Sequence, residues 1–190
     1  MTAILVSEVG LRDGLQSISR VMQLGAKKRW IAAEAAAGVR EIEVGSFVPP
    51  ALLPQMADTA ELVAFAKGIP GLTVVTLVPN AKGMALAAEA GVDSVSIPFS
   101  MSETHSIKNV RKDHPAMVAE IGAAASIAQD HGIHFAVGLS TAFGCTMEGA
   151  ASAEETSAAA RAAGSVRDRL CMVWRLRSRG DDRMAPGRLA

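Results

Sequence analysis

The sequence predicts an α/β fold built around a parallel β-sheet, and one repeated junction predicts it. Three times a stretch of helical character ends at a glycine, at Gly38, Gly91 and Gly132, and a run with alternating Val, Ile or Phe follows. Glycine suits the left-handed position that closes a helix, and the alternating run suits a strand. Strands and helices that alternate along a chain are typical of a parallel sheet covered by helices.

The junctions place most of the elements in order. Strands are expected after the three glycines, near 40–45, 93–98 and 133–140, and the helices that end at these glycines lie near 23–37, 80–90 and 114–131. Strands near 3–9 and 72–78 and helices near 57–67 and 152–163 fill the remaining intervals. The result is about five strand–helix units. Five units fit a doubly wound sheet and equally fit five-eighths of a (β/α)8 TIM barrel, a fold of about 250 residues.

Residues 1–164 are predicted to form one domain, and residues 165–190 differ from them in composition. The first segment holds 12 Lys and Arg and 16 Asp and Glu, a net charge of −4, whereas the second holds seven Arg and three Asp, a net charge of +4. A further junction at Gly164 predicts a sixth strand, but the fragments of Val, Cys, Met and Trp that follow could form only one short strand. We therefore expect an irregular, Arg-rich tail, of the kind that a truncated or frame-shifted gene would encode.

The composition narrows the classes of partner. With 49% hydrophobic residues and a mean hydropathy of +0.25, the 190 residues can bury a sizeable core. A net charge of zero offers no field that would recruit nucleic acid or an anionic membrane surface. No apolar run reaches the roughly 18 residues of a membrane span, and no signal peptide is recognisable, so a cytoplasmic protein is expected. Cys145 and Cys171 lie too far apart to suggest a disulfide framework or a zinc site.

The loop after the first expected strand carries the residues best suited to chemistry. In this fold class the reacting groups lie on the loops that follow the strands, and this loop reads Glu8-Val-Gly-Leu-Arg-Asp-Gly-Leu-Gln16. Asp13 could bind a hard divalent cation, Arg12 could stabilise developing oxyanion charge, and Gly14 permits a tight turn. The alternative is an Asp that caps a helix beside an Arg on the surface.

Several strings, taken in order, resemble the hydroxymethylglutaryl-CoA lyase family. They are EVGLRDGLQ, IEVGSFVPP, PQMAD, LVPNAKG and FGCTMEG, spread over residues 4–164. The Arg-Asp-Gly after the first strand is shared with a wider metal-dependent superfamily that includes isopropylmalate and homocitrate synthases. Those relatives resemble one another through a Glu where this chain has Leu15. The Leu-Gln pair and the Ser-Phe-Val-Pro-Pro loop favour the lyase branch.

The resemblance implies an incomplete TIM barrel and a retro-Claisen cleavage of a 3-hydroxy-3-methylglutaryl-CoA-type substrate to acetyl-CoA and acetoacetate, a reaction of leucine catabolism and ketone body metabolism. It implies that Arg12 polarises the thioester carbonyl and that Asp13 is one ligand of Mg²⁺ or Mn²⁺. Glu43 would support Arg12 or the substrate hydroxyl. Gln16, Ser102 and Asn109 would contact the acyl-CoA, and the family implies a homo-oligomer.

The chain also departs from the family pattern. It has Leu11 where the family usually has Pro, Gly45 where it has Thr, and Ser17-Ile-Ser19 where it has Asn-Glu-Lys. The late His-x-His pair, the Asn beyond it and the Gly-Gly-Cys-Pro loop with the catalytic Cys do not occur, so the metal site is incomplete and Cys145 is expected to be structural. The alternatives are a lyase, aldolase or synthase acting on another acyl-CoA or oxo acid, and a non-catalytic acyl-CoA-binding half-barrel.

Overall fold

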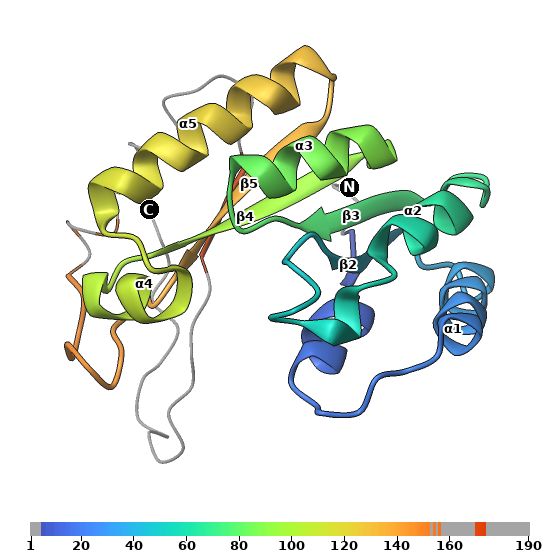
Figure 1. Cartoon of the computed structure of the whole chain (residues 1–190), viewed down its shortest axis with the longest axis horizontal. Helices are drawn as coiled ribbons and strands as arrows, with labels where there is room; N and C mark the ends of the chain where they lie inside the picture. Colours follow the sequence, from blue (N-terminus) through green and yellow to red (C-terminus); the bar gives the residue numbers. More distant parts are fainter. Residues whose placement is uncertain (1–4, 153, 155, 157–169, 174–190) are drawn as a thin grey trace.

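The computed structural model describes residues 5–152, 154, 156 and 170–173, and these residues build a parallel sheet with helices along it (Figure 1). The strands are β1 (Ser7–Glu8), β2 (Glu41–Ser46), β3 (Thr73–Leu77), β4 (Ser94–Ser100), β5 (His134–Ser140) and β6 (Leu170–Val173). Each strand pairs in parallel with the next one in the sequence, in the order β1-β2-β3-β4-β5-β6. A doubly wound sheet reverses its strand order at a switch point, so the sequential order identifies a partial barrel.

The helices follow the strands as the junctions predict. They are α1 (Leu24–Ala36), α2 (Thr59–Lys67), α3 (Ala81–Ala90), α4 (Glu103–Val110) and α5 (His114–Asp130), with a π-helical turn η1 (Gly10–Gly14) and a 3-10 turn η2 (Pro54–Met56). Strands β2 to β5 and helices α1, α2, α3 and α5 lie within two residues of their predicted bounds. Most of the helix predicted near 152–163 falls outside the described residues.

Polar side chains set where three of the helices begin. Asn80 accepts a hydrogen bond from the N–H of Gly83 at 2.9 Å before α3, and Asp113 accepts one from Ala116 at 2.9 Å before α5. Ser102 accepts one from His105 at 3.1 Å before α4. These caps satisfy backbone donors that the first turn of a helix leaves unpaired. Helix α3 ends at Gly91, which has a positive φ of 76° and so suits glycine.

The hydrophobic core lies between the sheet and the helices. Helices α2, α3 and α5 run along the same face of the sheet in Figure 1, and α3 packs against α5. Alternate strand residues such as Val74, Val95, Ile97 and Leu139 are completely buried on the helix side. The residues between them on β4 and β5 are small or polar, which leaves the inner face of the sheet able to hold functional side chains: Ser94, Ser96, Ser100, Ala136 and Gly138.

Two expectations about the elements need correction. The strand predicted near 3–9 is formed only at Ser7–Glu8 among the described residues, and the chain then turns into η1 because Glu8 Oε1 accepts the N–H of Gly10 at 2.6 Å. Helix α4, which the sequence did not predict, occupies the loop after β4. Strand β6 matches the short strand expected within the Arg-rich segment, and it pairs with β5.

The structure also shows why Gly45 is tolerated on β2. The pairing of β2 with β3 shifts by one residue between Glu43 and Gly45, which marks a β-bulge. A Cβ at Gly45 would lie 2.4 Å from Oγ1 of Thr59, whose hydroxyl bonds to Ser46 and to the carbonyl of Met56. Thr59 therefore occupies the space that a side chain at position 45 would need.

Within the described part of the chain, no helix combines the length and apolar character needed to cross a bilayer.

Candidate active site

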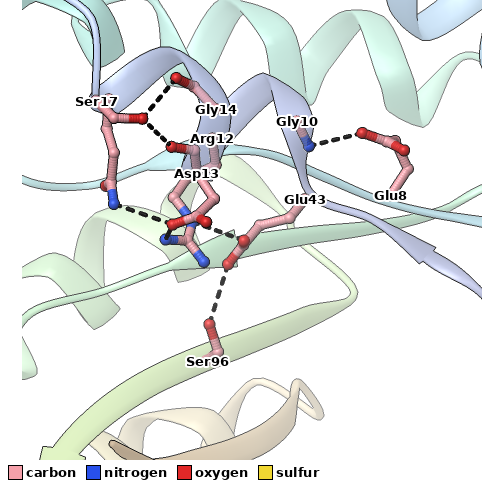
Figure 2. A network of polar contacts seen from close by, with 9 residues as sticks. Glu8, Gly10, Arg12, Asp13, Gly14, Ser17, Glu43 and Ser96 are labelled. Atoms are coloured by element: carbon pink, nitrogen blue, oxygen red, sulfur yellow. Dashed lines mark hydrogen bonds and ion pairs between the residues drawn. The ribbon is translucent and has the colours of Figure 1, made fainter. Parts of the chain in front are cut away.

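Arg12 is the centre of a polar network on the inner side of the sheet (Figure 2). It lies in η1, directly after β1, and is only 3% exposed. Its Nε donates to Oε2 of Glu43 at 2.6 Å, and its Nη1 donates to Oδ1 of Asp13 at 2.8 Å. The alternative of a surface Arg is therefore wrong, because the guanidinium is buried between two carboxylates.

Glu43 reaches the network from the middle of β2. Its side chain is buried, and its second oxygen, Oε1, accepts a hydrogen bond from Oγ of Ser96 on β4 at 3.1 Å. Burial raises the pKa of the Glu43 carboxyl above its ordinary value, while the charge of Arg12 and the hydrogen bonds from Arg12 and Ser96 oppose that rise. The result is a charge-assisted pair held inside the protein, where such pairs are strong and geometrically defined.

Asp13 and Gln16 form the outer edge of the same network. The Asp13 side chain is 49% exposed, and its Oδ1 accepts from both Nη1 of Arg12 and Nε2 of Gln16, the latter at 3.1 Å. The Asp13 carboxylate thus pairs with side chains, so the helix-capping alternative is wrong as well. The backbone carbonyls of Asp13 and Gly14 accept from Oγ of Ser17, which closes the turn around Gly14. The four predicted residues Arg12, Asp13, Gln16 and Glu43 therefore converge.

The residues present do not by themselves complete a metal centre. Among the described residues, no group of three or more His, Cys, Asp or Glu side chains is placed to hold a cation. Asp13 offers one half-exposed carboxylate that already accepts from Arg12 and Gln16. Mg²⁺ needs near-octahedral oxygen coordination, usually completed by water and substrate, so a single carboxylate is only one of its ligands.

A cavity of about 460 Å³ lies at the carboxyl ends of β4 and β5. Its walls combine apolar and polar side chains, and they include Ser102 from the list of predicted substrate-binding residues: Phe99, Met101, Ser102, His114, Thr141, Cys145 and Glu148. Ligand pockets have this size and this mixture of walls. Asn109, by contrast, is exposed on α4 and is not part of the cavity wall.

Thr141 closes the base of this cavity in a strained conformation. Its φ is +55°, which is unusual for a β-branched residue, and its side chain is buried. Its hydroxyl bonds to Oγ of Ser100 at 3.0 Å and accepts the N–H of Ser102 at 3.0 Å. Strained residues that the surrounding contacts hold in place cluster at functional sites.

Cys145 and Glu148 are two ionisable side chains in the cavity wall. A hydrogen bond with Ser102 lowers the pKa of the Cys145 thiol, burial opposes this effect, and the backbone N–H groups of Glu148 and Met147 lower the pKa further. Hydrogen bonds from the side chain and backbone of Thr104 lower the pKa of the exposed Glu148 carboxyl to about 2. The sequence predicted only that Cys145 is structural. It did not indicate that Ser96 would lie in the Arg12 network or that Thr141 and His114 would line the cavity.

The chain is similar to proteins of one family. A family model described as HMGL-like matches residues 3–171. A relative in Pseudomonas aeruginosa, a 3-hydroxy-3-isohexenylglutaryl-CoA/hydroxymethylglutaryl-CoA lyase, is 36% identical over 142 residues, which cover 75% of this chain and 47% of the relative.

Solved structures give the same result. A hydroxymethylglutaryl-CoA lyase from Pseudomonas aeruginosa matches with a TM-score of 0.79 and 33% identity, over 84% of this chain and 53% of that chain. A lyase from Acinetobacter baumannii, solved in complex with coenzyme A and 3-methylmalate, matches with a TM-score of 0.75 and 30% identity, over 85% of this chain and 54% of that chain. The chain spans about half the length of the relatives it matches.

Proposed function

Because this chain belongs to the HMGL-like family, we propose that it provides the first half of a carbon–carbon lyase that cleaves a 3-hydroxyacyl-CoA of the hydroxymethylglutaryl type. The observation that carries the proposal is the buried Arg12, held between Glu43 and Asp13 at the end of β1. The loops at the carboxyl ends of the strands are where barrels of this kind place their chemistry.

The geometry supports a retro-Claisen cleavage. In that reaction a base removes the proton from the 3-hydroxyl and the bond between C2 and C3 breaks, so that negative charge develops on the thioester oxygen of the departing enolate. The enolate then takes up a proton at C2 to give acetyl-CoA. Arg12 is the group suited to that charge, since a fixed and buried cation stabilises an oxyanion without reorganising. Glu43 and Asp13 hold the guanidinium in one orientation, and Gln16 holds Asp13. Acetyl-CoA and acetoacetate would be the products.

The acyl-CoA would extend from Arg12 towards the cavity at the ends of β4 and β5. Ser102 is the predicted substrate-binding residue with the best support, because it lines that cavity. A substrate contact by Asn109 is supported only by the resemblance to the family, because Asn109 is exposed on α4 and does not line the cavity.

A divalent cation is part of the proposal, with Asp13 as one ligand, and the remaining ligands of the family pattern do not occur in this chain. When bound, the cation would hold the hydroxyl and carboxylate oxygens of the substrate. The cytoplasmic location, the place in leucine catabolism and ketone body metabolism, and the homo-oligomer stay predictions.

A second candidate is a lyase whose substrate carries a 3-substituent larger than methyl. One observation favours it: the Pseudomonas aeruginosa relative is named for a 3-isohexenyl substrate as well as for the 3-methyl one. In the chimera described next, a higher kcat/KM for a 3-isohexenyl substrate than for the 3-methyl substrate would support this candidate.

A chimera tests the proposed function. Residues 5–140 of this chain would replace the matching half of the Pseudomonas aeruginosa lyase, and acetyl-CoA release from 3-hydroxy-3-methylglutaryl-CoA would be measured with and without Mg²⁺. We expect cation-dependent release, and we expect Arg12→Met to lower it by about a hundredfold or more, the scale of losing one oxyanion-stabilising group.

Arg20→Met serves as the matched control, because Arg20 is exposed in the loop that follows η1. A chimera that cleaves as fast with Met at position 12 as with Arg would refute the assigned role. A folded chimera that binds acyl-CoA but never cleaves it would favour the non-catalytic alternative.

A further inference from the structure

The two oxygens of the Glu43 carboxylate bond to different partners, one in η1 and one in β4. Oε2 accepts from Nε of Arg12 at 2.6 Å, and Oε1 accepts from Oγ of Ser96 at 3.1 Å. Figure 2 shows Ser96 below the Glu43 carboxylate and the Arg12 and Asp13 side chains beside it. The carboxylate is therefore held at both oxygens.

Ser96 reaches Glu43 across an intervening strand. Glu43 pairs with Val75 on β3, and Ser96 pairs with Leu77 on the same strand. The hydrogen bond thus joins β2 to β4 over the inner face of the sheet, a span of about 10 Å between strand axes. Ser96 is itself buried, and Glu43 is the partner that its hydroxyl has among the described residues.

We propose that Ser96 is a positioning residue, whose hydroxyl fixes the rotation of the Glu43 carboxylate and through it the orientation of the Arg12 guanidinium. The effect of Ser96 on catalysis rests on the proposed function, whereas its hydrogen bond to Glu43 does not. Without the Ser96 hydroxyl, Oε1 of Glu43 would be buried without its donor and would lose a charge-assisted hydrogen bond. The Glu43 carboxylate would then be free to rotate away from Nε of Arg12.

The neighbouring Ser94 provides a matched control. It lies on the same face of β4 and is buried to a similar degree, but its hydroxyl bonds to Nδ1 of His134 at 3.2 Å. Ser94→Ala and Ser96→Ala each remove one buried hydroxyl from the same strand. Only the second change removes a contact of Glu43, so a general loss of stability would affect both variants alike.

The experiment is hydrogen exchange of the Arg12 Nε–H group, followed by NMR in the full 190-residue chain labelled with ¹⁵N-arginine. The Arg12 signal is assigned by its loss in Arg12→Lys. We expect Ser96→Ala to accelerate exchange by about tenfold or more, the scale of losing one hydrogen bond to a charged group. Ser96→Thr, which keeps the hydroxyl, should restore the slow rate, and Ser94→Ala should leave it unchanged.

Unchanged exchange in Ser96→Ala would overturn the proposal, as would equal acceleration in Ser94→Ala. If Ser96→Ala does not fold, Ser96→Cys keeps the size of the side chain with a weaker donor, and exchange between the Ser and Ala values is expected; a rate equal to that of Ser96 would refute the role. The measurement needs no substrate. If the chimera shows no lyase activity while Ser96 controls Arg12 exchange, only the proposed function fails.

Discussion

At the scale of single residues, several polar side chains are buried with specific partners rather than left to solvent. Lys27 shows this most clearly, because it lies on α1 and is only 1% exposed. Its ammonium donates to the backbone carbonyl of Gln55 at 2.5 Å and to Oδ1 of Asp58 at 2.6 Å. Nε2 of Gln55 donates in turn to the carbonyl of Ile18. Lys27 thus connects α1, η2 and the loop that follows Gly14.

Lys27→Met is expected to lower the free energy of unfolding by about 3 kcal/mol. Removal of one partner from a buried ion pair leaves the other without compensation, and the Asp58 side chain is only 19% exposed. Urea denaturation followed by circular dichroism measures the change. Arg29→Met is the control, because Arg29 is exposed on the same helix and should change stability by less than about 0.5 kcal/mol. Equal effects of the two substitutions would contradict a structural role for the Lys27 contacts.

Single residues also show what sequence reasoning could and could not predict. Arg12, Asp13, Gln16 and Glu43 were identified because they lie in recognisable strings, and the structure brings them together. Ser96 carries no such signal, because a serine in a strand gives no indication of which carboxylate its hydroxyl will reach. That contact depends on the register of three strands, which pattern alone does not determine.

At the scale of elements, the junctions at Gly38, Gly91 and Gly132 predicted the strands and helices well because each combines a helix end with an apolar run. Helix α4 lacks such a signal, because it is short, it contains only two apolar side chains, Ile107 and Val110, and it ends at Arg111 rather than at a glycine. The π-helical turn η1 was missed because part of what holds it lies far away in the sequence. Its bonds from Arg12 and Asp13 to the carbonyl of Val9 are local, but the buried side chain of Arg12 depends on Glu43 from another strand.

Helices α3 and α5 are joined by a carboxylate, which makes their packing dependent on pH. Glu120 on α5 accepts the N–H of Ala81, the first residue of α3, at 2.9 Å and pairs with Lys112. The hydrogen bond from Ala81 and the one from Lys112 lower the pKa of Glu120 below its ordinary value of 4.5. An anion at a helix N-terminus is also favoured by the helix dipole.

Glu120→Gln is expected to lower the free energy of unfolding at neutral pH by about 1 kcal/mol, since the contacts are partly exposed. The folded pKa is lower than the unfolded one, so the stabilisation is complete above about pH 4.5 and is lost as the pH falls through the folded value. Denaturation of both proteins between neutral pH and about pH 3 should show the difference shrinking. Glu89→Gln, at an exposed position of α3, should show little difference at any pH. A constant difference for Glu120→Gln would rule out the assigned ionisation.

At the scale of the whole molecule, the described strands form an open parallel sheet in sequential order, whereas a closed barrel of this type has eight strands. The two structural matches cover 53% and 54% of the longer chains. The part that the structure describes therefore corresponds to one side of the barrel. It carries the Arg12 network and the cavity next to Ser102.

The 190-residue chain, assayed alone, is expected to show no cleavage of 3-hydroxy-3-methylglutaryl-CoA above a chelator-treated control. Its described residues hold a single candidate carboxylate ligand at Asp13 and no group of three ligands. Weak acyl-CoA binding is expected from the same chain, because the cavity next to Ser102 is formed. Calorimetry measures the binding, and an assay of released acetyl-CoA measures the turnover. Cation-dependent acetyl-CoA release by this chain would show that the metal site has been placed wrongly.

The sequential strand order has a consequence for how the protein is made. Each strand pairs with the one synthesised just before it, so β2 can dock on β1, and β3 on β2, without waiting for later residues. Each pairing joins residues 19 to 40 positions apart, from Val75 with Ser94 to Ser94 with His134, and pairing over such separations takes roughly milliseconds to seconds. Because the ribosome adds residues more slowly than such contacts form, the sheet can grow from its N-terminal edge as the chain emerges. Nascent chains stalled at about residue 130, when β3 has left the ribosomal exit tunnel, should already protect the β2 and β3 amides from exchange.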